Sequence, residues 1–336
     1  MTGTGQTPLV SVVVPARGEA ERIGRCLGAI LGQDWPVDRL EILVVDGGPG
    51  DGIAEVASAV LARHPGVRSA VLANPGGTRS GNLNRGLRAA TGDIVCRVDA
   101  RSLIPPYYVR RCVDRLADPS IAAVGGSQHS IAPSADWRGT GIARALNNRL
   151  AMGMARYRRG GPSGPTDTVY LGAFRARDLR ELGGWAEDLD VNEDFDLNRR
   201  MARLGTVWFE STLVVDYLPR ESLARIARQY FGFGRWKVGY LRERGESPRA
   251  RQVVALAVVP GSVAVASVIA GSRSRVALLV ASGALALLLE QAGNSERTAQ
   301  SPVRSRLWSI GTCAAVVGSW SVGAWFELLA GPLRRR

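Results

Sequence analysis

Short apolar runs alternate with longer segments of helical periodicity through the first half of the chain. The apolar runs predict buried strands at 9–15, 40–46, 67–74, 93–99 and 121–127. The amphipathic segments between them predict helices at 19–33, 53–64, 79–90 and 105–118. This alternation predicts an α/β domain with a mostly parallel sheet and helices on both faces.

The pattern changes after about residue 250. Residues 253–272 and 307–326 are two runs of 20 residues without a charge, and 276–289 is apolar but shorter. Because about 20 apolar residues can cross the hydrocarbon core of a bilayer, we expect two membrane helices, with the third segment left open. The alternative is a set of core helices buried in a soluble domain.

The chain is basic, with a net charge of +13. Between residues 220 and 251, nine basic residues stand against three acidic ones, directly before the first long apolar run. Such an excess is typical of the cytoplasmic flank of a membrane helix. A basic chain can also bind nucleic acid, but no motif or repeat supports that partner.

The remaining composition narrows the chemistry. Two histidines cannot build a histidine-rich zinc site, and the four cysteines lack paired metal-site spacing, which favours reduced and buried thiols. The first ten residues show no basic start followed by an apolar core, so no secretory signal is expected. No glycine-rich dinucleotide or P-loop motif is present. A nucleotide site must therefore use side chains at strand ends.

Three acidic groups lie where such a site is expected. Asp46 ends one predicted strand and Asp99 another, and ligands of parallel sheets bind beyond the carboxyl ends of the strands. Glu193 and Asp194 open a helix within 190–201. Each group alone has an ordinary explanation as a turn residue or a helix cap. Their order and spacing together favour a functional site.

That order resembles family 2 glycosyltransferases with the GT-A fold, and most closely the membrane-bound members that assemble exopolysaccharides, including the succinoglycan type. The resemblance extends from residue 9 to about 252. The stretches that carry it are SVVVPARGEAERI, VVDGGPGDG, NPGGTRSGNLNRG, RVDAR, DTVYLGAFRARDLRELGGW, NEDFDLNRR and RQYFGFGRWK.

The resemblance implies roles for individual residues in donor binding. The base and ribose pocket is expected at Pro15, Arg17, Glu19 and Asp46, and the diphosphate or donor sugar at Asn74, Arg79 and Asn82. The family usually has Asn at position 18 and often a second Asp at position 47, where this chain has glycine. The nucleobase is therefore not implied.

The resemblance also implies the catalytic groups. Asp99 matches the first acid of a D-x-D-like motif for a divalent cation, Mg²⁺ or Mn²⁺, and Asp194 matches the general base, with Glu193 beside it. One base without a nucleophilic carboxylate fits a single displacement that inverts the anomeric carbon. Trp185 matches an aromatic residue that stacks on the acceptor, although a core tryptophan fits its surroundings equally well.

Arg101 stands where a second metal ligand is expected. Arginine stays protonated and offers no lone pair, so it cannot be that ligand, but it can pair with phosphate oxygens. Three interpretations follow. Arg101 replaces part of the charge of the metal ion, it points away and leaves a weakened site, or the protein binds a donor without turning it over.

Residues 220–240 combine basic and aromatic side chains in one predicted helix. Such a helix can lie in the membrane interface. It also resembles the Q-x-x-R-W element that closes over donor and acceptor in membrane glycosyltransferases, through Gln229, Arg235 and Trp236. An ordinary amphipathic helix is the alternative.

These observations predict a GT-A catalytic domain over 1–219, an interfacial segment over 220–252 and a membrane region over 253–336. The expected activity is transfer of a sugar from a nucleotide-diphosphate-sugar to a lipid-linked or cell-envelope glycan, by a multi-pass membrane protein whose catalytic domain faces the cytoplasm. The alternatives are a non-catalytic nucleotide-sugar-binding membrane component and a nucleotidyltransferase. The latter lacks its expected lysine-bearing loop after the first strand.

Overall fold

A computed structural model describes residues 7–48, 50–153, 155–189, 191–245, 247–248, 250–272, 274–294 and 301–330. It divides into two compact units. Unit 1 comprises Met1–His129 and Ala155–Tyr217, and unit 2 comprises Ser130–Met154 and Leu218–Arg336. The second unit thus includes Ser130–Met154, a segment that the predicted division of the chain did not separate from the catalytic domain.

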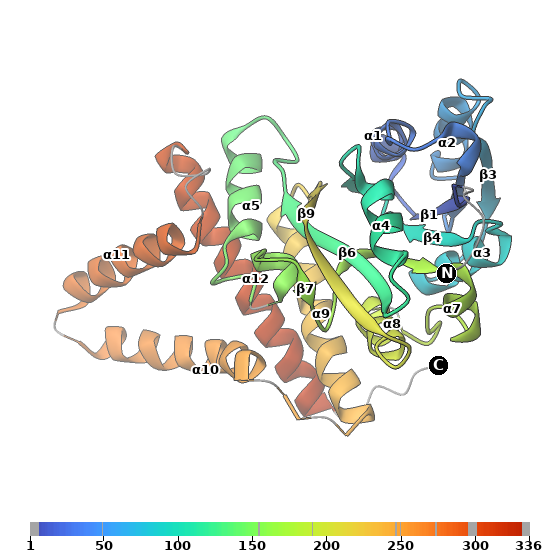
Figure 1. Ribbon diagram of the computed structural model, residues 1–336. Coiled ribbons are helices and arrows are strands. Elements are labelled where there is room, and N and C mark those ends of the chain that lie inside the picture. Colours follow the sequence, from blue (N-terminus) through green and yellow to red (C-terminus); the bar gives the residue numbers. More distant parts are fainter. Residues whose placement is uncertain are drawn as a thin grey trace. The chain divides into compact units, whose positions relative to one another are not determined.

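Unit 1 is built on one nine-stranded sheet within the described residues (Figure 1). Strands β3, β2, β1, β4, β8, β6, β9 and β5 follow one another across it, and β7 pairs with β9. Their bounds are β1 Val10–Ala16, β2 Leu40–Asp46, β3 Arg68–Ala73, β4 Ile94–Arg97, β5 Ser102–Leu103, β6 Ile121–Ser130, β7 Gly164–Pro165, β8 Tyr170–Arg175 and β9 Thr206–Tyr217.

The sheet is mixed, which corrects the expectation of a mostly parallel sheet. Strands β1 to β4 pair in parallel, as predicted. Strand β8 then pairs antiparallel with both β4 and β6, and β5 and β7 pair antiparallel with β9. The strand that pairs with the free edge of β4 is β8, which comes from much later in the chain. The hydrophobic periodicity of a segment does not show which strand it pairs with or in which direction.

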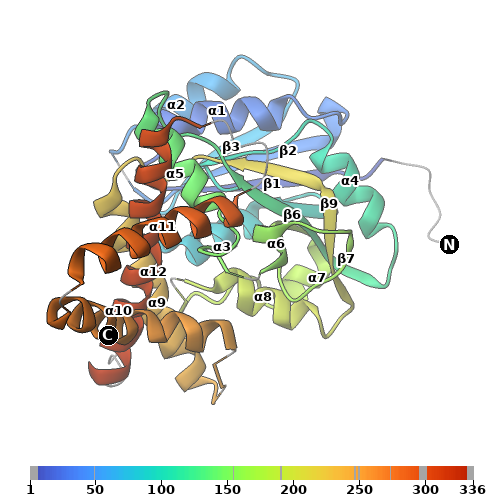
Figure 2. The same cartoon turned by 90° about the vertical axis from the view of Figure 1, so that its left-hand side faces the viewer.

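Helices cover both faces of the sheet, as predicted (Figure 2). Alternate residues of β1 point to opposite faces, so Val12 and Val14 join one core cluster and Val13 joins the other. The first face is packed by α1 (Ala20–Leu31), α2 (Ile53–Leu61) and α4 (Tyr108–Leu116). The second is packed by α3 (Arg79–Ala89), α7 (Ala176–Glu181) and α8 (Glu193–Met201).

The parallel register brings the candidate residues to one edge of the sheet. Ala16 at the end of β1 pairs with Asp46 at the end of β2, and Asp46 pairs with Ala73 at the end of β3. Val13 pairs with Arg97, the last residue of β4. The loops that follow these strands therefore meet beyond their carboxyl ends, where ligands of such sheets bind.

Unit 2 is helical within the described residues. Helix α12 packs along α9 and α5, and it also contacts α10 and α11 (Figure 1). A Cβ added to Gly234 or Gly323 would lie within 2.1 Å of a carbonyl oxygen of the facing helix, so glycine permits the close approach of α9 and α12. The bounds are α5 Trp137–Asn147, α9 Leu223–Glu243, α10 Ala250–Gly271, α11 Arg275–Gly293 and α12 Val303–Ala330. Unit 1 also contains the short helix α6 (Arg156–Arg159).

Two of the helices that the structure describes in unit 2 are long and apolar enough to cross a membrane, judged by length and composition. They are Gln252–Gly271 and Val303–Ala330, and Leu278–Gly293 is a shorter apolar helix. This matches the predicted pattern of two long segments and one short one. The short helix ends in a buried ion pair, in which Glu290 contacts Arg144 of α5, with Arg306 of α12 at 3.6 Å.

Candidate active site

The loops after β1 and β2 form one wall of the site. Asp46 is buried, and the Gly48 N–H donates to its Oδ1 at 2.9 Å. Burial raises the pKa of Asp46 above its usual range, although the bond from Gly48 opposes the shift. The two loops are tied together because the Gly18 N–H donates to Asp51 Oδ2 at 2.6 Å. Pro15 lies in β1 opposite Val45.

Asn74 and Asn82 form the next part of the wall. The Asn74 Nδ2 donates to Asn82 Oδ1 at 2.8 Å, which joins the loop after β3 to the first turn of α3. A Cβ on Gly47 would lie 2.4 Å from Asn82 Nδ2, and one on Gly77 would lie 2.1 Å from Asn74 Nδ2. An aspartate at position 47 would therefore require Asn82 to move. Glycine at position 47 leaves the space that Asn82 occupies in its pair with Asn74.

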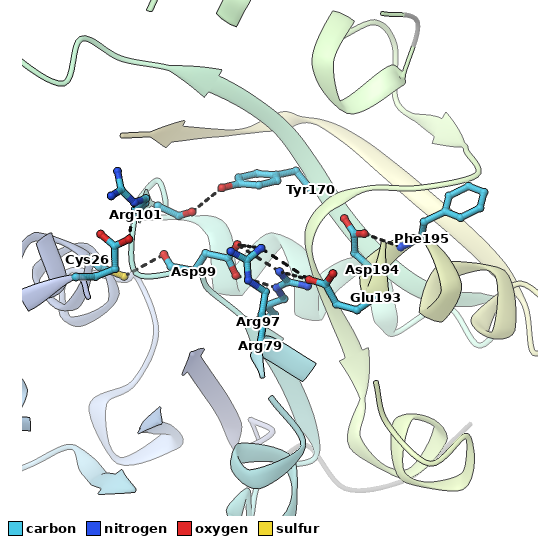
Figure 3. A network of polar contacts seen from close by, with 11 residues as sticks. Cys26, Arg79, Arg97, Asp99, Arg101, Tyr170, Glu193, Asp194 and Phe195 are labelled. Carbon is cyan, nitrogen blue, oxygen red and sulfur yellow. Dashed lines mark hydrogen bonds and ion pairs between the residues drawn. The ribbon is translucent and has the colours of Figure 1, made fainter. Parts of the chain in front are cut away.

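A four-residue charge cluster occupies the centre of the site (Figure 3). Arg97, buried at the end of β4, donates from Nε to Asp99 Oδ1 at 2.8 Å and from Nη2 to Glu193 Oε1 at 3.0 Å. Arg79, at the start of α3, lies 3.9 Å from Asp99 Oδ2 and 3.8 Å from Glu193 Oε1. The consecutive elements α3 and β4 thus meet α8, which lies about a hundred residues later in the chain, through two carboxylates and two guanidinium groups.

The cluster shifts the pKa values of its members. Burial alone would raise the pKa of Asp99, but Arg97 and Arg79 outweigh it and lower that pKa. Burial alone would lower the pKa of Arg97, but Asp99 and Glu193 raise it. Burial raises the pKa of Glu193, and Asp194 adds to the shift while Arg97 opposes it. Asp99 and both arginines are therefore charged at neutral pH.

Helix α8 presents its two acids differently. It begins after Asn192, which has a left-handed backbone with φ of 67°. Glu193 is 3% exposed and bound to Arg97, whereas Asp194 is partly exposed and accepts at Oδ1 from the Phe195 N–H at 2.7 Å. Asp194 is therefore the acid of the pair that a substrate can reach.

Arg101 does not contact Asp99. Its Nε donates to Glu19 Oε1 at 2.6 Å, and both side chains are buried. The arginines beside Asp99 are Arg97 and Arg79, and the sequence analysis missed Arg97. A signal was present, because Arg97 is the one charged residue in the otherwise apolar run 94–98 of a predicted buried strand.

Trp185 is a core residue, which corrects its expected acceptor-stacking role. Its side chain is 2% exposed and packs edge-on against Phe174, with ring centroids 6.1 Å apart. A buried indole leaves no face for a sugar. Three partly exposed tyrosines lie elsewhere in unit 1: the Tyr170 ring contacts those of Tyr157 and Tyr217, each at a centroid distance of 6.4 Å. The Tyr170 hydroxyl lies 2.7 Å from Ser102 Oγ. The sequence analysis did not single out these tyrosines.

The expected closing element lies on α9, in unit 2. Arg235 Nε is 3.4 Å from Glu327 Oε2, and its guanidinium lies 4.9 Å from the ring centre of Phe326 on α12. Gln229 and Trp236 are partly buried on the same helix. Closure of this helix over a donor stays a prediction. Arg17 lies against Gly48 in unit 1, with its Cγ 3.1 Å from a Cβ placed there.

The donor set fits a divalent cation poorly. Both oxygens of Asp99 already face arginine nitrogens, and Arg101 cannot ligate. No group of three His, Cys, Asp or Glu side chains that could hold a metal ion occurs among the described residues. Unit charges of the same sign 4 Å apart repel by about 4 kcal/mol at an effective dielectric constant of about 20, so a dication beside these guanidinium groups is opposed. The residues around Asp99 therefore do not fit the metal site that the resemblance implies.

Known proteins share this architecture. The mannosyltransferase PcManGT from Pyrobaculum calidifontis, solved with GDP-Man and Mn²⁺, superposes with a TM-score of 0.66 over 97% of this chain and 88% of its own, at 23% identity. At that identity the likeness shows the fold, and it confirms the expected GT-A architecture.

Two sequence relatives cover most of this chain. The succinoglycan biosynthesis protein ExoA of Rhizobium meliloti is 27% identical over 252 residues, which are 74% of this chain and 75% of ExoA. The beta-monoglucosyldiacylglycerol synthase of Synechocystis is 30% identical over 252 residues, which are 71% of this chain and 50% of that synthase.

The family assignment rests on a family model. This model, described as glycosyltransferase-like family 2, matches residues 7–237, from just before β1 into α9. The matched region contains every candidate residue at the strand ends and at the start of α8. The chain therefore belongs to the family 2 glycosyltransferases.

Proposed function

We propose that this glycosyltransferase moves one sugar from a nucleotide-diphosphate-sugar to a lipid-linked or cell-envelope glycan acceptor, with inversion at the anomeric carbon. The observation that carries the proposal is the position of Asp194 directly after Glu193, the acid that joins the start of α8 to Arg79 and Arg97 beyond the strand ends. A base for the acceptor and positive charge for the leaving diphosphate are the two things that this reaction requires.

The donor would lie across the ends of β1 to β4. Pro15, Arg17, Glu19 and Asp46 would line the base and ribose, with Asp46 accepting from the nucleobase. Asn74 and Asn82, held by their mutual hydrogen bond, would face the diphosphate or the donor sugar. Arg101 would act through Glu19, which it fixes at the edge of the pocket.

Asp194 would act as the general base. The acceptor hydroxyl gives its proton to the Asp194 carboxylate while its oxygen forms a bond to the anomeric carbon. The bond from that carbon to the diphosphate oxygen breaks, and the diphosphate leaves with the electron pair. Glu193 is engaged by Arg97 and would hold the cluster rather than accept the proton.

The acceptor is proposed to be membrane-bound. The apolar helices of unit 2 and the basic segment before them support a multi-pass protein whose catalytic domain faces the cytoplasm. The names of the relatives point to an exopolysaccharide and to a glucosylated diacylglycerol. Both acceptor classes are consistent with a transferase that works at a membrane surface.

The proposal is tested by transfer to defined vesicles. Radiolabelled UDP- and GDP-sugars are incubated with the detergent-solubilised full chain and vesicles that contain diacylglycerol or polyprenyl-phosphate-linked sugars. We expect label in the lipid fraction and an equal amount of released nucleoside diphosphate. Nucleotide binding without release from any donor would indicate the non-catalytic binding component instead.

A further inference from the structure

We infer, on the basis of the proposed function, that Arg79 and Arg97 supply the positive charge that holds the donor diphosphate, so that donor binding needs no divalent cation. In this respect the chain departs from the metal-dependent pattern that the resemblance implies. The contacts that support this are those of Arg79, Arg97, Asp99 and Glu193.

Arg97 has a buried donor that lacks an acceptor. Its Nε and Nη2 bind Asp99 and Glu193, but its Nη1 is buried with no hydrogen-bond partner among the residues the structure describes. Buried polar groups in proteins are nearly always paired, so an orphaned guanidinium nitrogen at a candidate site indicates a missing partner. A phosphate oxygen matches it, because guanidinium groups bind phosphates through charge-assisted hydrogen bonds.

Arg79 contributes a second, more accessible cation. Its side chain is 54% exposed, and its distances of 3.9 Å and 3.8 Å to Asp99 and Glu193 are those of ion pairs without direct hydrogen bonds. It occupies the first turn of α3, next to the asparagine pair. Its N–H donors can therefore turn to a diphosphate while its charge stays near the two acids.

The same contacts obstruct a metal ion. A dication on Asp99 would compete with the Arg97 Nε at Oδ1, and at either oxygen it would lie beside both guanidinium groups. Glu193, the other carboxylate of the cluster, is bound by the same two arginines. Arginine remains protonated at any working pH, so its positive charge opposes a dication over that whole range.

The test combines Mn²⁺ binding with nucleotide binding on the detergent-solubilised full chain. Binding of Mn²⁺ alone is followed by the loss of its free EPR signal. The affinities for UDP, GDP, ADP and dTDP are measured by calorimetry in EDTA and in Mn²⁺. The variants are Arg79→Gln and Arg97→Gln, with Arg88→Gln as the matched control, because Arg88 lies on the same helix with its side chain 65% exposed.

For the unaltered chain we expect no Mn²⁺ binding without nucleotide, and an affinity for one diphosphate that agrees within about twofold in EDTA and in Mn²⁺. Arg79→Gln should weaken that affinity by about tenfold in both buffers, as for the loss of a charge-assisted contact, while Arg88→Gln leaves it unchanged. Arg97→Gln frees two carboxylates, so it should gain Mn²⁺ binding and become metal-dependent. If Arg97→Gln does not fold, the nucleotide affinities of Arg79→Gln and of the unaltered chain in EDTA and in Mn²⁺ still test the inference.

Two results would overturn the inference in distinguishable ways. Nucleotide binding that appears only with Mn²⁺ contradicts the inference and leaves the proposed function standing. No binding of any diphosphate in either buffer contradicts the proposed function itself, and the inference with it.

Discussion

Arg97 donates from Nε to Asp99 Oδ1 at 2.8 Å, from a position two residues earlier along the chain. Side chains two positions apart in an extended segment lie on the same face, so the sequence R-x-D at the end of β4 allows the two groups to approach each other. Arg97 then reaches Glu193 on α8. The acid expected to bind a metal is held by an arginine that also contacts the first residue of α8.

Asp46 is expected to lower the stability of the folded protein at neutral pH. Burial raises its pKa in the folded chain, and a carboxyl group with a raised folded pKa favours folding only while it is protonated. Its contribution is present below the unfolded pKa of about 3.9 and is lost as the pH rises through the folded pKa. Asp46→Asn should therefore raise the melting temperature at pH 7, with a gain that shrinks toward pH 4, while nucleotide binding weakens.

Asp51 provides the matched control for Asp46. Its carboxylate accepts from the Gly18 N–H at 2.6 Å and from the Ile53 N–H at 3.1 Å. Asp51→Asn weakens two charge-assisted bonds, so it should lower the melting temperature at pH 7. The account of Asp46 would be wrong if both variants shifted the melting temperature downward.

Arg101 is expected to matter first for stability. Removing one member of a buried ion pair leaves the other buried and uncompensated, at a cost of about 3–5 kcal/mol in the free energy of unfolding. Arg22 lies 3.7 Å from Glu19 and would still offset part of its negative charge. Arg101→Met should therefore lower the free energy of unfolding by about 3 kcal/mol, near the lower end of that range. Thermal unfolding and nucleotide calorimetry on the same preparation separate the two roles. Lost binding at unchanged stability would instead place Arg101 on the diphosphate.

Trp185 is expected to act through packing. Trp185→Ala should lower the free energy of unfolding by about 3–5 kcal/mol, because it opens a cavity against Phe174 in a fully buried region. Tyr157→Ala removes a partly exposed aromatic side chain of unit 1 and should cost less stability. If Trp185→Ala left the free energy of unfolding unchanged but raised the acceptor concentration needed for half-maximal rate, Trp185 would instead stack on the acceptor.

The sequence predicted the first four strands and their helices because their apolar periodicity is regular. It also placed Asp46 and Asp99 at strand ends; Asp46 is the last residue of β2, and Asp99 lies two residues beyond the end of β4. Strand β8 escaped prediction because Leu171 and Gly172 both have positive φ, which interrupts the extended pattern, and its pairing with β6 shifts register between Val124 and Gly126. No local pattern reveals such an irregular strand or its direction.

Within the site, the sequence indicated which residues take part but not which of them touch. Arg97 and Arg101 are both arginines close to Asp99 in the chain, and only the packing assigns Arg97 to Asp99 and Arg101 to Glu19. The sequence could not decide whether Trp185 is a core residue or stacks on the acceptor, because its ring is buried against Phe174 of β8, a strand that the sequence did not predict. Contacts between distant elements are decided by the tertiary structure, which residue spacing does not encode.

The central claim, that Asp194 is the base of a transfer reaction, is tested most directly by one comparison. Nucleoside diphosphate release from the preferred donor is measured for the unaltered chain and for Asp194→Asn, after calorimetry shows that both bind the nucleotide equally. General base catalysis contributes about 10²–10⁴-fold, so we expect release to fall by at least about a hundredfold with nucleotide affinity unchanged. Release at an unaltered rate would contradict the account.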